Sequence, residues 1–249
     1  MQMGMKTLWI LLLAALAVFQ SPLRAGNLYV VVAGVADYQY LNPLNLPEKD
    51  AQLIAGLYKQ QTKNVVLLTG RYATKQRILN SLRQQFARAG EDDMVVFAFS
   101  GHGYRGGICP YEMEDEQDGI SYREIQSILK QSKARKKIIW ADACYSGGLR
   151  LDGREDESPQ PEATDVVFFL SSRTGETSQE IPFKANGIFT THLVRGLRGG
   201  ADANRDRKIT ARELFLFVSQ RVTQESQGKQ HPVMWGNFDD NYVVMDWSR

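Results

Sequence analysis

The sequence has little cysteine, no excess of charge and no long hydrophobic run. Cys109 and Cys144 are its two cysteines in 249 residues, so a structural disulfide between them is one interpretation. Outside residues 1–25, which hold two basic residues and no acidic one, the chain is formally neutral. Its composition therefore gives no support for a nucleic-acid partner. The sequence also lacks an internal repeat and any Asn-x-Ser/Thr glycosylation site.

The longest apolar run, from Leu8 to Phe19, is too short to span a bilayer comfortably. It follows Lys6 and precedes a polar, proline-containing stretch that ends at Ala25, which is the layout of a secretory signal peptide. Leu23 departs from the small residue preferred before a cleavage site. We expect removal of residues 1–25 and export of the domain 26–249 to a bacterial periplasm or medium, without a stable membrane anchor.

Strand-like and helix-like segments alternate along the rest of the chain. Apolar runs predict strands at residues 27–35, 64–69, 93–103, 136–143, 166–172 and 241–247. Apolar residues at helical spacing predict helices at residues 46–60, 74–90, 121–132, 187–200 and 211–222. This alternation favours an α/β fold with a mostly parallel sheet. The charged segment 149–165, which contains two prolines, is typical of a mobile loop.

Two predicted strands end in residues that can carry chemistry. His102 follows the third strand in the stretch SGHG, and Cys144 follows the fourth in DACYSGG. Ligands of parallel sheets bind at the carboxyl ends of the strands, so we expect these two side chains to be neighbours. A thiol becomes a strong nucleophile as a thiolate, and a nearby imidazole can hold its proton. The N–H groups of Gly103 and Cys144 could then stabilise an oxyanion.

The stretches FAFSGHG and IIWADACYSGG, in this order and after apolar strands, resemble the caspase–metacaspase superfamily of cysteine peptidases. The closest resemblance is to its bacterial, metacaspase-like members, and it extends over roughly residues 27–245. It implies a caspase-like three-layer sandwich with about six mostly parallel strands. It also implies an endopeptidase in which His102 is the general base and acid and Cys144 is the nucleophile. No cofactor is required for such chemistry.

The same resemblance implies a substrate preference. Metacaspases cut polypeptides after Arg or Lys, and their specificity pocket is acidic. Asp142, two residues before the nucleophile, and Asp50, in the stretch EKDA, match the pocket acids. Two carboxylates suit a bidentate guanidinium. The alternatives are a structural acid at Asp142 and a surface or helix-turn carboxylate at Asp50. Preference for Asp would need an arginine-lined pocket, for which Arg173 is the one candidate.

Several other interpretations remain open at this stage. A catalytically silent caspase-fold scaffold would keep the fold, with Cys144 bonded to Cys109 or with no substrate bound. Self-cleavage after Arg150 or Arg154 is the prediction for the loop, and an uncut loop is the alternative. We interpret His192 and His231 as structural residues and expect a monomer.

The stretch DANRDRKITARE, residues 202–213, resembles an EF-hand calcium loop. Its ligands would be Asp202, Asn204, Asp206, the Lys208 carbonyl, Thr210 and Glu213. Arg207 stands where glycine is expected for a left-handed turn, at a cost of about 1 kcal/mol. The alternative is a polar loop capped by its own carboxylates, so Ca²⁺ is a predicted but optional ligand.

Overall fold

The computed structural model describes residues 26–104, 106–143, 166–172, 185–236, 238–239 and 241–248. Its main sheet has six strands in the order β10-β8-β7-β3-β1-β2. All neighbouring pairs are parallel except β10 with β8, which is antiparallel. The predicted six-stranded, mostly parallel sheet is confirmed.

The strand positions agree closely with the apolar runs of the sequence. The main sheet consists of β1 (Leu28–Gly34), β2 (Val65–Thr69), β3 (Met94–Gly101), β7 (Lys136–Ala143), β8 (Val166–Leu170) and β10 (Val233–Trp235). Strand β10 was not predicted. The predicted last strand forms as β11 (Val243–Asp246), but it pairs with β9 (Lys208–Thr210) in a separate two-stranded sheet.

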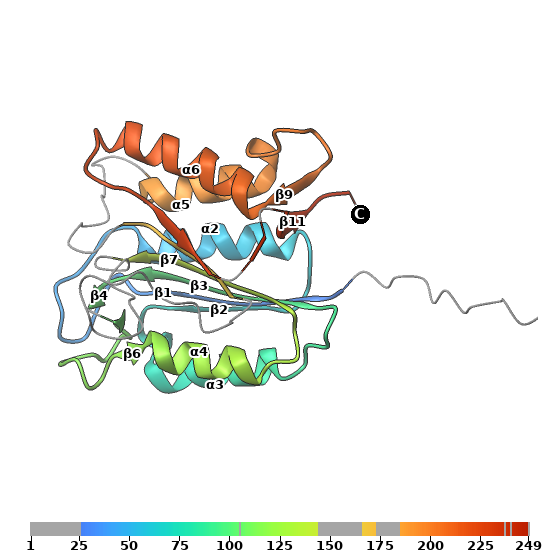
Figure 1. Ribbon diagram of the computed structural model, residues 1–249. Helices are drawn as coiled ribbons and strands as arrows, with labels where there is room; N and C mark the ends of the chain where they lie inside the picture. Colours follow the sequence, from blue (N-terminus) through green and yellow to red (C-terminus); the bar gives the residue numbers. More distant parts are fainter. Residues whose placement is uncertain are drawn as a thin grey trace, which may run out of the picture.

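Helices cover both faces of the main sheet and complete the three layers (Figure 1). They are α2 (Pro47–Lys59), α3 (Lys75–Phe86), α4 (Tyr122–Gln131), α5 (Ile188–Arg195) and α6 (Ala211–Glu225). Helices α3 and α4 lie on one face, and α2, α5 and α6 lie on the other. The predicted helix 187–200 begins as α5 and continues as a π-helical turn, Gly196–Gly200. Among the described residues, no helix is long and apolar enough to cross a membrane.

Successive side chains along each strand point to opposite faces of the main sheet and form a hydrophobic core on each face. Val31 and Phe97 point into the core under α3 and α4, whereas Val32 and Trp140 point into the core under α2, α5 and α6. Trp140 donates a hydrogen bond from Nε1 to the buried Tyr58 hydroxyl at 2.7 Å. Because both faces of the sheet are covered, its central strands are apolar over most of their length.

A small antiparallel sheet follows β3. It consists of β4 (Gly103–Tyr104), β5 (Gly107–Ile108) and β6 (Ile120–Ser121). Strand β6 leads directly into α4, which begins with a reciprocal capping box between Ser121 and Glu124. The segment after β3 is therefore held by its own hydrogen bonds and by a well-capped helix.

Candidate active site

The carboxyl ends of β3 and β7 lie side by side. Their parallel register pairs Ser100 with Asp142 and ends at the pair Gly101 and Ala143. His102 is the next residue after one strand, and Cys144 is the next residue in the sequence after the other. Cys144 itself lies outside the described residues. The register nevertheless brings the ends of the two strands that precede these residues to the same edge of the sheet.

The loop between β1 and α2 contacts His102 at its backbone N–H and at its ring Nε2. The Tyr38 hydroxyl accepts a hydrogen bond from the His102 backbone N–H at 2.6 Å, and the two rings are 4.9 Å apart. His102 Nε2 lies 2.8 Å from the backbone carbonyl oxygen of Asn42. A carbonyl oxygen can only accept, so this contact places the proton on Nε2. In the neutral imidazole, Nδ1 is then the atom that can take up a proton.

Neither contact was predicted from the sequence. Asn42 acts through its backbone, and residue identity carries no signal for a backbone acceptor. Tyr38 follows the first strand closely, but an aromatic residue at that place has many possible roles. Gly101 makes room for the contact, since a side chain there would lie 2.5 Å from the Tyr38 hydroxyl oxygen.

The predicted oxyanion donor Gly103 lies in β4, opposite Ile108 of β5. The Cys109 N–H donates to the His102 carbonyl at 3.0 Å, so this carbonyl points towards β5. The C=O and N–H of one trans peptide unit point in opposite directions, so the Gly103 N–H is turned away from β5. Its partner in the predicted hole, the Cys144 N–H, lies outside the described residues.

Asp50 and Asp142, here called the acid pair, meet at the same strand edge. Asp50 lies in the first turn of α2 and is 2% exposed, and Asp142 lies near the end of β7 and is 8% exposed. A β-carbon added to Gly187 would lie 3.0 Å from an oxygen of Asp50 and 2.9 Å from one of Asp142. The structure therefore brings together two predicted acids that are far apart in the sequence.

Neutral donors hold the first of these carboxylates. Asp50 accepts hydrogen bonds from Ser100 Oγ at 3.1 Å, from Asn186 Nδ2 at 2.9 Å and from the Gly187 N–H at 3.0 Å. Burial, and next the negative charge of Asp142, raise the pKa of Asp50 from 3.8 to about 7. The hydrogen bonds oppose this shift without overcoming it.

The start of α5 holds the second carboxylate. Asp142 accepts from the Thr190 hydroxyl at 2.8 Å and from the Thr190 N–H at 3.3 Å. One short segment, Asn186 to Thr190, thus donates to both members of the acid pair. The sequence predicted a helix here but gave no sign that its first turn contacts two acids from other elements.

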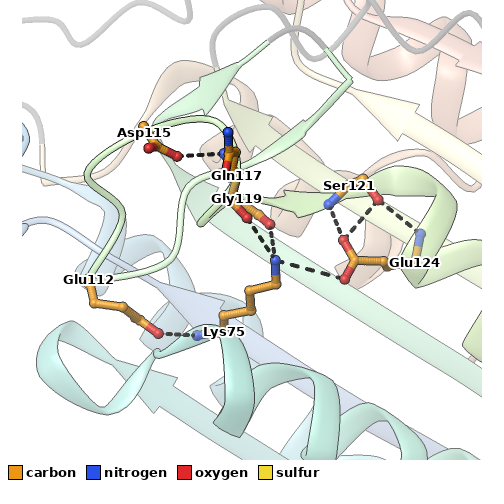
Figure 2. Close-up of polar contacts among 7 residues, drawn as sticks. All are labelled: Lys75, Glu112, Asp115, Gln117, Gly119, Ser121 and Glu124. Carbon is orange, nitrogen blue, oxygen red and sulfur yellow. Dashed lines mark hydrogen bonds and ion pairs between the residues drawn. The ribbon is translucent and has the colours of Figure 1, made fainter.

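A polar cluster fastens the segment after His102 to the start of α3 (Figure 2). The Lys75 ammonium donates to the carbonyl oxygens of Gln117 at 3.2 Å and Gly119 at 2.7 Å, and it lies 3.9 Å from a Glu124 carboxylate oxygen. The Lys75 N–H donates to Glu112 Oε1 at 3.0 Å. These contacts hold the chain between β5 and α4 against the body of the domain.

The predicted calcium loop has part of the geometry that such a loop needs. Arg207 takes a φ of +66°, so the left-handed turn forms without glycine. The Asp202 carboxylate accepts from the N–H groups of Asp206 and Arg207, and Glu213 caps α6 together with Thr210. Within the described ranges, no group of three or more His, Cys, Asp or Glu side chains is placed to hold a metal ion. The donors suit Ca²⁺ chemically, and the prediction stays untested.

Several other sequence interpretations involve residues that lie outside the described ranges. Cys109 is buried, but its proposed partner Cys144 lies outside the described residues, as do Arg173 and the loop 149–165 with its two predicted cleavage sites. His192 is buried, and its Nε2 lies 2.7 Å from a Glu225 carboxylate oxygen. This contact between α5 and α6 is consistent with a structural histidine.

Comparison with known proteins identifies the class to which this fold and site belong. The family model for the caspase domain matches residues 28–242, so the chain belongs to the caspase family, within the caspase–metacaspase superfamily of cysteine peptidases. Metacaspase-9 of Arabidopsis thaliana is 26% identical over 165 residues, or 56% of this chain. The match covers 49% of that protein, so the chain spans about half the length of this relative.

A solved structure supports the fold independently. Protein GSU0716 from Geobacter sulfurreducens superposes with a TM-score of 0.66 at 15% identity, and the match covers 89% of this chain and 98% of that one. At this identity the similarity concerns the fold alone. Together with the family match, it confirms the caspase-like α/β architecture predicted from the sequence.

Proposed function

We propose that this protein is a cysteine endopeptidase that cuts polypeptides after Arg or Lys, with His102 as base and acid and Cys144 as nucleophile. The observation that carries the proposal is the acid pair, which lies at the same strand edge as His102. Two buried carboxylates held by neutral donors favour a cationic side chain, and a guanidinium can bond to both. Binding of that side chain would set the following peptide bond beside the histidine.

The chemistry follows from the tautomer of His102. Nδ1 takes the thiol proton as sulfur attacks the carbonyl carbon, and the Gly103 and Cys144 N–H groups stabilise the oxyanion. Collapse breaks the C–N bond, and Nδ1 returns the proton to the leaving amine. Water then attacks the thioester while Nδ1 takes up its proton. Breaking the C–S bond releases the acid product, and the proton on Nδ1 passes to sulfur and restores the thiol.

A peptide panel tests this function. Fluorogenic peptides that differ only in Arg, Lys or Asp before the cleaved bond are compared under reducing conditions, with and without Ca²⁺. We expect turnover of the Arg and Lys peptides and none with Cys144→Ala. Turnover of the Asp peptide alone would contradict the specificity. Absence of all turnover, together with no labelling of Cys144 by an electrophile, would favour the silent scaffold.

The proposal extends to self-processing in the loop 149–165. Arg150 and Arg154 follow the nucleophile closely in the sequence and have the residue type that the acid pair favours. Intact-mass measurement should show cleavage after one of them in the wild type but not in Cys144→Ala. Identical masses would refute self-processing and leave the peptidase proposal standing.

We further propose that the enzyme is exported and acts as a monomer. Its first 25 residues have the layout of a signal peptide. N-terminal sequencing of protein recovered from the periplasm or medium should begin at Gly26. Retention of Met1 would contradict export by this route.

A further inference from the structure

Gly187, the residue at the start of α5, has no side chain and lies beside the acid pair. Gly187 is buried, and its N–H donates to Asp50 Oδ1 at 3.0 Å. Its backbone angles, φ −58° and ψ 150°, are open to any residue. Glycine is therefore not needed here for its conformational freedom, so the reason for it must lie in the space around its α-carbon.

The α-carbon of Gly187 packs closely against both carboxylates of the acid pair. A β-carbon at position 187 would lie 2.9 Å from Asp142 Oδ2 and 3.0 Å from Asp50 Oδ2, closer than carbon and oxygen normally approach. The carboxylates cannot easily retreat. Asp50 is tied to Ser100 and Asn186, and Asp142 is tied to the Thr190 hydroxyl. A methyl group would thus crowd both of the oxygens that a cation would have to reach.

We propose that Gly187 is a specificity-determining residue, whose missing side chain leaves the notch between Asp50 and Asp142 open to the cationic side chain of the substrate. This inference rests on the proposed function, because it names the feature that lets the acid pair receive Arg or Lys. Asn186 and Thr190 hold the two sides of the notch, and Gly187 keeps the space between them free.

The test is Gly187→Ala, with Gly56→Ala as the matched control. Gly56 is exposed on α2 with no atom within 4 Å of an added β-carbon, so the same methyl group meets nothing there. One misplaced methyl group in a binding site changes discrimination by roughly 10- to 200-fold. We expect Gly187→Ala to raise KM for the Arg and Lys peptides within this range, and Gly56→Ala to leave KM unchanged.

Two measurements separate the notch from other effects. Iodoacetamide, which needs no specificity pocket, should alkylate Cys144 equally fast in the wild type and Gly187→Ala, whereas an arginyl chloromethyl ketone should react at least tenfold more slowly with the variant. Wild-type kinetics on Gly187→Ala with the Arg peptide would overturn the inference while leaving the peptidase proposal intact. A wild type that cuts no Arg or Lys peptide would instead overturn the proposed function.

A wild-type experiment decides the matter if Gly187→Ala fails to fold. A peptide whose arginine carries two methyl groups on one guanidinium nitrogen keeps its charge but is wider at the tip. A tight notch should turn it over at least tenfold more slowly than the unmodified Arg peptide. Equal turnover would show that the space beside Gly187 does not limit the substrate.

Discussion

Replacing Asp50 by Asn should stabilise the folded protein at pH 8 and have little effect near pH 4. Burial and the nearby Asp142 charge raise the pKa of Asp50 to about 7 in the folded state, against 3.8 in an unfolded chain. Between these two values the folded state binds the proton and the unfolded state does not. The stability that Asp50 contributes is therefore complete below pH 4 and is lost as the pH rises towards 7.

The size of the effect follows from the shift. Each pKa unit corresponds to about 1.4 kcal/mol, so a shift of about three units costs the wild type up to about 4 kcal/mol by pH 8. Asn has nearly the same shape and carries no charge. Its carbonyl can accept from Asn186 and Gly187, and the Ser100 hydroxyl can turn to accept from its amide. The variant should thus regain most of this free energy at pH 8.

Urea unfolding from pH 4.5 to 8 measures the difference directly. Both proteins should carry Cys144→Ala, so that self-cleavage does not interfere. Asp92→Asn removes an exposed carboxylate and serves as the control, with an expected change within about 0.5 kcal/mol. If Asp50→Asn and its parent differ by the same amount at every pH, Asp50 does not carry the buried charge argued here, and the reasoning is refuted.

Three further predictions concern the surroundings of the site. Tyr38→Phe keeps the ring but leaves the His102 N–H without its acceptor, so steady-state kinetics should show kcat falling about tenfold with KM unchanged; a change in KM alone would contradict a positioning role. Lys75→Met removes two hydrogen bonds to carbonyl oxygens and a partly exposed ion pair, and urea unfolding should show a loss of about 1–2 kcal/mol. Millimolar Ca²⁺ should raise the melting temperature of the wild type but not of Glu213→Gln, and no shift in the wild type would remove the calcium site.

The positions of most main-sheet strands were predictable because these strands are buried on both faces. A continuous apolar run such as residues 27–35, in a chain where helices alternate with such runs, is typical of a buried parallel strand. The exception is β10, with three residues, Val233–Trp235, which are too few to show a pattern. The run 241–247 was apolar enough to predict a strand, but no sequence pattern reveals which partner a strand selects, and β11 pairs with β9 instead of the main sheet.

In the candidate site, too, some residues could be predicted from the sequence and others could not. His102, Asp50 and Asp142 could be named from the sequence because their side chains carry the chemistry and stand beside recognisable strands or helices. The Asn42 carbonyl could not be predicted as a partner of His102, because every residue has a backbone carbonyl. Which carbonyl reaches the histidine depends on the course of the loop between β1 and α2. Gly187 could not either, because its role depends on how α5 meets an acid 137 residues earlier in the chain.

The electrostatics of Asp50 explain why a protein would keep an arrangement that weakens its fold. Its donors Ser100, Asn186 and Gly187 are all neutral, so they satisfy its oxygens without compensating its charge. A buried carboxylate in this state binds a proton at neutral pH, and it should bind a guanidinium for the same reason. Under the proposed function, the free energy that burial of this charge costs the fold is recovered when the guanidinium of the substrate binds. It follows that KM for an Arg peptide should rise as the pH falls below about 7, because the proton and the substrate compete for the same charge. A pH-independent KM between pH 5.5 and 8 would show that the acid pair does not receive the substrate's cation.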